Sequence, residues 1–210
     1  MSKAAETLAR RDFMLAVAAM ALVVLASNIL VQYPVALGRL GDYLTWGAFS
    51  YPFAFLVTDL SNRRFGPAGA RRVVYAGFVL AVALSATFAT PRIAVASGTA
   101  FLAAQLLDIG IFARLRDRAW WLPPLVSSVI SSALDTAIFF SLAFYCGTLP
   151  GLGFTIADAL GRIGIADECA TLPWVNLAVA DYGVKLALAA LSIAPYGALL
   201  TVIRREERLA

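Results

Sequence analysis

Residues 13–36 read FMLAVAAMALVVLASNILVQYPVA, a run that contains no charged side chain. A helix needs about 20 apolar residues to cross a hydrocarbon core of about 30 Å, so this run is long enough to span a bilayer. It follows a basic N-terminus, as a signal peptide would, but it is too long for the apolar core of a cleaved signal. Further runs of this kind fill the chain at 43–60, 71–90, 93–113, 120–146 and 173–202. The sequence therefore predicts an all-α bundle of six transmembrane helices, forming a single integral membrane domain over 1–210.

Composition excludes several other classes of protein. Hydrophobic residues make up 61% of the chain and charged residues 14%, more apolar surface than a soluble domain of this length can bury. There is no histidine, which removes the commonest zinc ligand and the commonest general base near neutral pH. Cys146 and Cys169 lack metal-ligand spacing, and no phosphate-binding loop of the P-loop type is present. We expect no metal, no cofactor and no nucleic-acid partner.

The basic residues indicate the orientation in the membrane. Thirteen of the 17 fall before the first run, between the second and third, between the fourth and fifth, or after the sixth: Lys3, Arg10, Arg11, Arg63, Arg64, Arg71, Arg72, Arg114, Arg116, Arg118, Arg204, Arg205 and Arg208. These four segments share one side of a six-span protein, whereas Arg39, Arg92 and Arg162 fall on the other. The positive-inside rule then places both termini in the cytoplasm of a bacterial inner-membrane protein.

Small residues recur at helical spacing on two spans. Gly77, Ala81, Ser85 and Ala89 do so on the third span, and Ser127 and Ser131 on the fifth. Small side chains at this spacing let helix backbones approach closely in lipid. We interpret these faces as packing surfaces, and the first would serve a homodimer as well as the bundle.

Four carboxylates and one ammonium lie in or at the edge of the spans: Asp59, Asp108, Asp135, Asp181 and Lys185. An Asp or Lys at a helix centre costs about 2.5–3.5 kcal/mol on insertion scales, so each is a candidate functional residue. Asp59 lies near Arg63 and Arg64, where it can reach cytoplasmic water or form an ion pair. Asp108, with Gln105 one turn away, is either a packing residue or a gating or proton-coupling residue.

The remaining charges lie deeper. Asp135 falls near the middle of the fifth span and is the main candidate for the substrate or coupling site. Asp181 and Lys185 are four residues apart and can pair on one helix face, which would by itself account for both.

An outer polar cluster completes the candidate site. Asn28 and Gln32 share a face of the first span, and Trp46, Phe49 and Ser50 enter the second span from the same side. Amides, a hydroxyl and aromatic rings suit a flat heterocycle, which needs a surface to stack on and hydrogen-bonding groups along its edge. Three classes fit: a transporter for a small polar molecule, an intramembrane aspartyl enzyme using Asp108 and Asp135, and a binding subunit that serves a partner ATPase.

Several stretches resemble the YhhQ family of queuosine precursor transporters, which are vitamin-uptake-transporter-like integral membrane proteins. The most specific is 45–59 (TWGAFSYPFAFLVTD). The others are 28–34 (NILVQYP), 64–66 (RFG), 70–72 (ARR), 92–97 (RIAVAS), 105–108 (QLLD), 112–116 (FARLR), 120–121 (WW), 135–136 (DT), 181–182 (DY) with Lys185, and 195–197 (PYG).

This resemblance implies uptake of 7-cyano-7-deazaguanine and 7-aminomethyl-7-deazaguanine, without an ATPase partner. It also implies a six-helix fold similar to the substrate-binding subunits of energy-coupling-factor transporters. Asp135 or Asp181 would accept the two N–H groups on one edge of such a base, and Gln105, Asn28 or Gln32 would donate to its carbonyl. Trp46 or Phe49 would stack on the ring. The segment 147–172 fits the family least, and whether Cys146 and Cys169 form a disulfide stays open.

Overall fold

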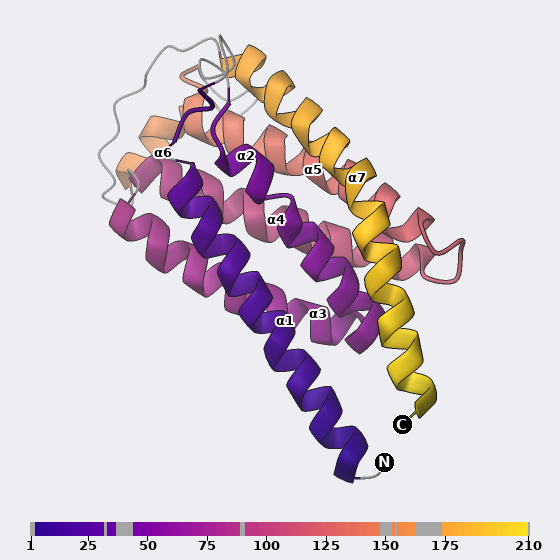
Figure 1. Ribbon diagram of the computed structural model, residues 1–210. Helices are drawn as coiled ribbons and strands as arrows, with labels where there is room; N and C mark the ends of the chain where they lie inside the picture. The colour runs from indigo at the N-terminus through magenta and orange to yellow at the C-terminus, as the bar shows by residue number, and fades with distance from the viewer. Residues whose placement is uncertain are drawn as a thin grey trace.

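The computed structural model describes residues 3–31, 33–36, 44–88, 91–147, 153, 155–162 and 174–209. Within these ranges the fold is helical apart from isolated bridges, one of which joins Pro34 to Thr45 in antiparallel fashion. The helices pack into one elongated bundle (Figure 1). They are α1 (Lys3–Leu30), α2 (Gly47–Ser50), α3 (Phe53–Phe88), α4 (Pro91–Leu115), α5 (Leu122–Phe144), α6 (Ile156–Arg162) and α7 (Trp174–Leu209).

Five helical stretches of the described chain are long and apolar enough to cross a membrane. They are Ala9–Leu30, Gly47–Leu84, Pro91–Leu115, Leu122–Phe144 and Trp174–Ile203. Large apolar side chains remain exposed on their outer faces, for example Leu22, Val179 and Leu191. Soluble proteins rarely expose so many large apolar side chains to water, so these faces are suited to contact with lipid. The structure is therefore that of a multi-pass membrane protein.

The predicted second and third spans fall within the single element α3, whose backbone breaks at Gly66. This glycine has φ 73° and ψ 178°, a conformation essentially confined to glycine, and Pro67 follows it. Before the break, Ser27 of α1 pairs with Ser50 and Phe13 packs on Phe65. Beyond the break, Gly77 approaches Met20. From residue 50 to 65 the contacts on α1 move from Ser27 back to Phe13, and beyond Gly66 they move forward again to Met20. The two arms of α3, 53–65 and 67–88, therefore run in opposite directions.

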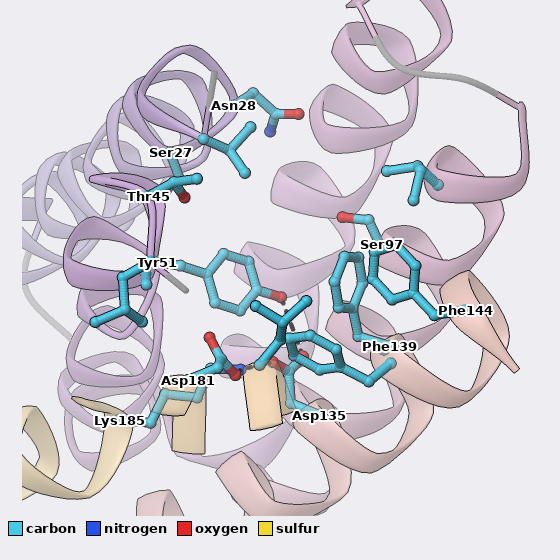
Figure 2. Close-up of a pocket in the computed structure, with 18 residues that line it drawn as sticks. Ser27, Asn28, Thr45, Tyr51, Ser97, Asp135, Phe139, Phe144, Asp181 and Lys185 are labelled. Carbon is cyan, nitrogen blue, oxygen red and sulfur yellow. Dashed lines mark hydrogen bonds and ion pairs between the residues drawn. The ribbon is translucent and has the colours of Figure 1, made fainter. Parts of the chain in front are cut away.

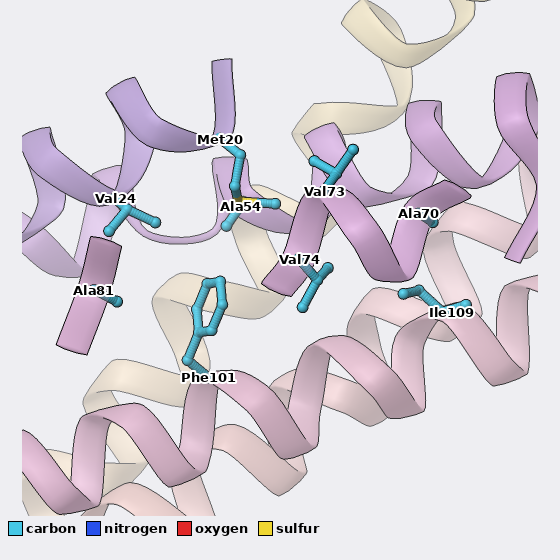
Figure 3. Close-up of a cluster of buried hydrophobic side chains, with 9 residues drawn as sticks. All are labelled: Met20, Val24, Ala54, Ala70, Val73, Val74, Ala81, Phe101 and Ile109. Carbon is cyan, nitrogen blue, oxygen red and sulfur yellow. The ribbon is translucent and has the colours of Figure 1, made fainter. Parts of the chain in front are cut away.

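The apolar core joins these arms to α1 and α4. Figure 3 shows Met20 and Val24 of α1 facing Ala54 and Val74 of α3, with Phe101 of α4 beneath them. A Cβ added to Gly77 would lie 2.5 Å from the Met20 Cγ, so a larger residue here would force the Met20 side chain to shift. The predicted small-residue face of the third span is therefore used within the bundle. The side chain of Ser85 and the whole of Ala89 lie outside the described part of the chain.

The bundle has two distinct ends. Both ends of the chain lie together at one of them, called here the terminal end, and α2 and α6 lie at the other, the far end (Figure 1). Toward the far end, the buried Arg92 donates to the Leu142 and Tyr145 carbonyls at 2.8 and 2.9 Å. These bonds satisfy carbonyls that the end of α5 leaves without helical partners.

Helix ends differ from the predicted span ends where local chemistry intervenes. The helix α1 ends at Leu30 rather than near residue 36, because Pro34 disfavours helix in the residue before it. The segment 147–172 contains the short helix α6. Thr155 and Asp158 cap its start reciprocally, since each donates a backbone N–H to the other's side chain. Cys146 is disulfide-bonded, and Cys169 lies outside the described residues.

Candidate binding cavity

A cavity of about 430 Å³ lies in the half of the bundle toward α2. Small-molecule sites commonly measure about 300–1,000 Å³, so this volume suits one compact ligand. The helices α1, α2, α4, α5 and α7 all contribute to its wall. The lining side chains with polar groups are Ser27, Asn28, Thr45, Tyr51, Ser97, Asp135, Asp181 and Lys185.

A buried ion network forms one end of the cavity. The Lys185 Nζ donates to Asp135 Oδ2 at 2.7 Å, to Thr136 Oγ1 at 3.0 Å and to Asp181 Oδ2. An ammonium group has three donors, so these contacts use all of them. The side chains of Lys185 and Asp135 are only 5% and 4% exposed, which is tolerable in a membrane protein because each charge is paired.

The two carboxylates of this network differ in what they leave for a ligand. Asp135 uses its second oxygen as well, accepting from the Tyr51 hydroxyl at 3.4 Å. Asp181 binds Lys185 and Thr136 through Oδ2, and its other oxygen points into the cavity (Figure 2). Two carboxylates also share one ammonium, so the formal charge of the network is negative. The cavity therefore offers an acceptor to a ligand that carries N–H donors.

The walls above the network are aromatic. Tyr51 lies on one side, and Phe139 and Phe144 lie on the other (Figure 2). Phe140 also lines the cavity. Asn28 and Ser97 lie away from the ion network, and Asn28 is at the opposite end of the cavity (Figure 2). A flat, polar ring fits this combination, since its faces would contact aromatic side chains while its two edges meet polar groups at opposite ends.

The structure brings together only some of the predicted site residues. Asn28, Asp135, Asp181 and Lys185 line the cavity. Ser50 is not among the lining residues, and its hydroxyl pairs with the Ser27 hydroxyl at 2.9 Å.

The predicted aromatic residues lie elsewhere. Trp46 and Phe49 pack on each other with ring centroids 5.8 Å apart, and neither is among the lining residues. Trp46 is 44% exposed. Gln32 lies outside the described residues.

Sequence reasoning missed the phenylalanine wall on α5. Phe139, Phe140 and Phe144 form part of an apolar run, where nothing separates a cavity-lining ring from one that faces lipid. Thr136 was also missed as a partner of both Asp181 and Lys185. In the sequence, the only indication of this role was that Thr136 directly follows Asp135.

A second polar cluster lies nearer the terminal end and does not line the cavity. Asp59 accepts from the Ser127 and Ser128 hydroxyls at 3.2 and 3.4 Å, and Asp108 is its carboxyl neighbour. Gln105, one turn from Asp108, accepts from Thr58. This set, together with Asn62 and Ser131, is called here the inner cluster.

Two expectations about these acids do not hold. Asp59 does not reach water or pair with an arginine, because it is 2% exposed and bonded to serines. Arg64 binds Asp12 instead, at 2.9 Å. Asp108 and Asp135 do not form an aspartyl pair, since Asp135 is held by Lys185. The described residues also contain no group of three acidic or cysteine side chains suited to a metal.

A bundle of membrane-spanning helices around a polar, charged cavity is consistent with a membrane transporter. The family model described as "Putative vitamin uptake transporter" matches residues 45–90 and 83–199. The chain belongs to this family of transporters.

Relatives extend over most of the chain. A protein of Escherichia coli (strain K12) named "Queuosine precursor transporter" is 34% identical, with 88% of this chain and 85% of the relative covered. A Haemophilus influenzae protein named "Probable queuosine precursor transporter" is 32% identical, covering 88% and 84%. A Bacillus subtilis protein of the same name is 28% identical, covering 78% and 75%. No solved structure matches the chain.

Proposed function

We propose that this protein imports queuosine precursors, 7-cyano-7-deazaguanine, 7-aminomethyl-7-deazaguanine or both, into the cytoplasm. The names of the relatives supply the substrate class. The observation that carries the proposal is the cavity itself, where one carboxylate oxygen of Asp181 points into the cavity below an aromatic wall.

The chemistry of a deazaguanine matches this arrangement. One edge of the ring presents a ring N–H beside an exocyclic amino group, and Asp181 would accept from both. The carbonyl and the 7-substituent would then lie toward Ser97 and Asn28, and Tyr51 or the phenylalanines would contact the ring faces. Gln105 lies in the inner cluster, so we assign it no contact with the base.

Charge and topology support transport toward the cytoplasm. The reversal of α3 at Gly66 adds a crossing to the five candidate spanning stretches, which supports six crossings with both termini on one side. The thirteen basic residues on that side favour a cytoplasmic location. The cavity, nearer the far end, would then receive the base from the periplasm. Similarity to the binding subunits of energy-coupling-factor transporters stays a prediction.

The test is binding of 7-cyano-7-deazaguanine, 7-aminomethyl-7-deazaguanine, guanine and adenine to purified protein, measured by calorimetry. We expect saturable binding of a deazaguanine and none of adenine, whose corresponding edge lacks the paired donors. Absence of deazaguanine binding would overturn the proposal. Uptake of the bound base by liposomes that contain this protein alone, without ATP, would exclude an ATPase-dependent binding subunit.

A further inference from the structure

The inner cluster has more hydrogen-bond acceptors than its donors satisfy. Neither carboxylate oxygen of Asp108 has a hydrogen-bond partner among the described residues, and neither does Asn62 Oδ1. Asp108 and Asn62 are both fully buried. A buried acceptor without a donor is costly, and a carboxylate more so than an amide.

The unpartnered amides and hydroxyl belong to the same layer as the two acids. Asn62 donates to the carbonyl of Ile109, the residue after Asp108, at 3.0 Å. Gln105, whose Nε2 is also unpartnered, accepts from Thr58, the residue before Asp59. Ser131, buried with its hydroxyl unpartnered, lies one turn from Ser127 on α5. The unpartnered groups thus come from three helices, α3, α4 and α5.

No cation compensates the two carboxyls within the described structure. The lysine and arginine side chains at this level are engaged elsewhere: Lys185 with Asp135 and Asp181, and Arg64 with Asp12. Arg63 and Arg116, toward the terminal end, each donate to the other's backbone carbonyl. The helix α7 contributes Tyr196, whose ring packs on Phe112. Two adjacent carboxyls without a cation in a low-dielectric interior repel each other strongly when both are charged, so one proton bound between them would stabilise the pair.

We propose that Asp59 and Asp108 form a proton-binding site that couples proton movement to transport of the base. A proton would convert one carboxylate into a donor for the other and relieve both the repulsion and the unmet acceptors. The site and the cavity share the helix α5, on which the buried Ser131 and Ser132 lie between Ser127 and Asp135. Ser127 and Asp135 are eight residues apart, or about 12 Å along a helix. This inference depends on the proposed function.

The experiment compares the wild type, Asp59→Asn and Asp108→Asn in proteoliposomes with 7-cyano-7-deazaguanine, a neutral base. Three quantities are measured: binding by calorimetry, exchange of labelled for unlabelled base at equal pH, and accumulation driven by an imposed pH gradient. One proton per base allows the wild type to accumulate base up to about tenfold per pH unit. We expect both variants to bind and exchange base but to accumulate none above the level without a gradient. Asp117→Asn, the same change at an exposed site, should accumulate base like the wild type.

The proposal would be overturned if both Asn variants accumulated as much base as the wild type under the pH gradient. It would also be overturned if a sodium gradient, but not a pH gradient, drove accumulation of base by the wild type. Failure of the wild type to bind the base would instead refute the proposed function. If the Asn variants do not fold, Ser127→Ala provides a second measurement. Because it removes a donor to ionised Asp59, exchange should reach half its maximum at a higher pH, and an unchanged pH profile would also overturn the proposal.

Discussion

Replacing Asp181 by asparagine should weaken base binding far more than it weakens the fold. The substitution keeps the size of the side chain but removes the negative charge and replaces one acceptor oxygen by an NH₂ donor. Asp181 is 15% exposed at its side chain, and Lys185 keeps its bond to Asp135 without it. The ion network therefore survives, with one carboxylate left for one ammonium.

The magnitude follows from the lost contact. A hydrogen bond to a charged group contributes about 1.5–3 kcal/mol, so losing one such bond to the base should raise its Kd about 10- to 150-fold. Asp135→Asn should weaken the fold more than it weakens base binding. It breaks the 2.7 Å ion pair within the bundle, so we expect a loss of stability of about 1.5–3 kcal/mol.

The assay is calorimetric titration of 7-cyano-7-deazaguanine into each purified variant, with unfolding followed in the same detergent. Asp117→Asn controls for removal of one negative charge from the exposed surface. A Kd for Asp181→Asn within twofold of the wild type would refute the assignment of the cavity-facing oxygen to the base. Equal losses of binding and of stability in both variants would show that the network acts only as a structural unit.

Two further predictions concern the fold. Gly66→Ala should destabilise the protein by about 1–3 kcal/mol, because φ 73° with ψ 178° is strained for any residue with a Cβ. Gly110→Ala, where an added Cβ meets nothing within 4 Å, should leave the unfolding temperature equal or slightly raised, and equal effects of the two would argue against the strain. Hydrogen bonds from Thr155, first from its backbone N–H and second from its hydroxyl, lower the pKa of Asp158 below its usual 3.8. The ionised carboxylate therefore stabilises α6 fully above pH 3.8, and this stabilisation is lost as the pH falls through the lowered pKa. Hydrogen exchange should show that protection of the α6 amides falls below pH 3.8 in the wild type but not in Asp158→Asn. Protection of the wild-type amides that does not change with pH would contradict this capping role.

Local properties of the chain follow from the order of its residues. Membrane spanning depends on the length of each apolar run, and the placement of basic residues depends only on their positions along the chain. The pairing of Asp181 with Lys185 was also predictable, because residues four apart on a helix are neighbours whatever surrounds them. Family membership followed from sequence stretches such as 45–59 and was confirmed by the relatives.

Contacts between helices depend on the tertiary structure. The bilayer solvates every apolar face equally well, so hydropathy does not show which phenylalanines of α5 line a cavity or that Trp46 stays outside it. Helix crossing brings Asp135 to Lys185 and separates it from Asp108, which lies beside Asp59 instead. The sequence alone specifies which charged residues enter the membrane. The packing of α3, α4, α5 and α7 then divides them between a binding cavity and the inner cluster, because charges buried in a low-dielectric interior must find their partners on other helices.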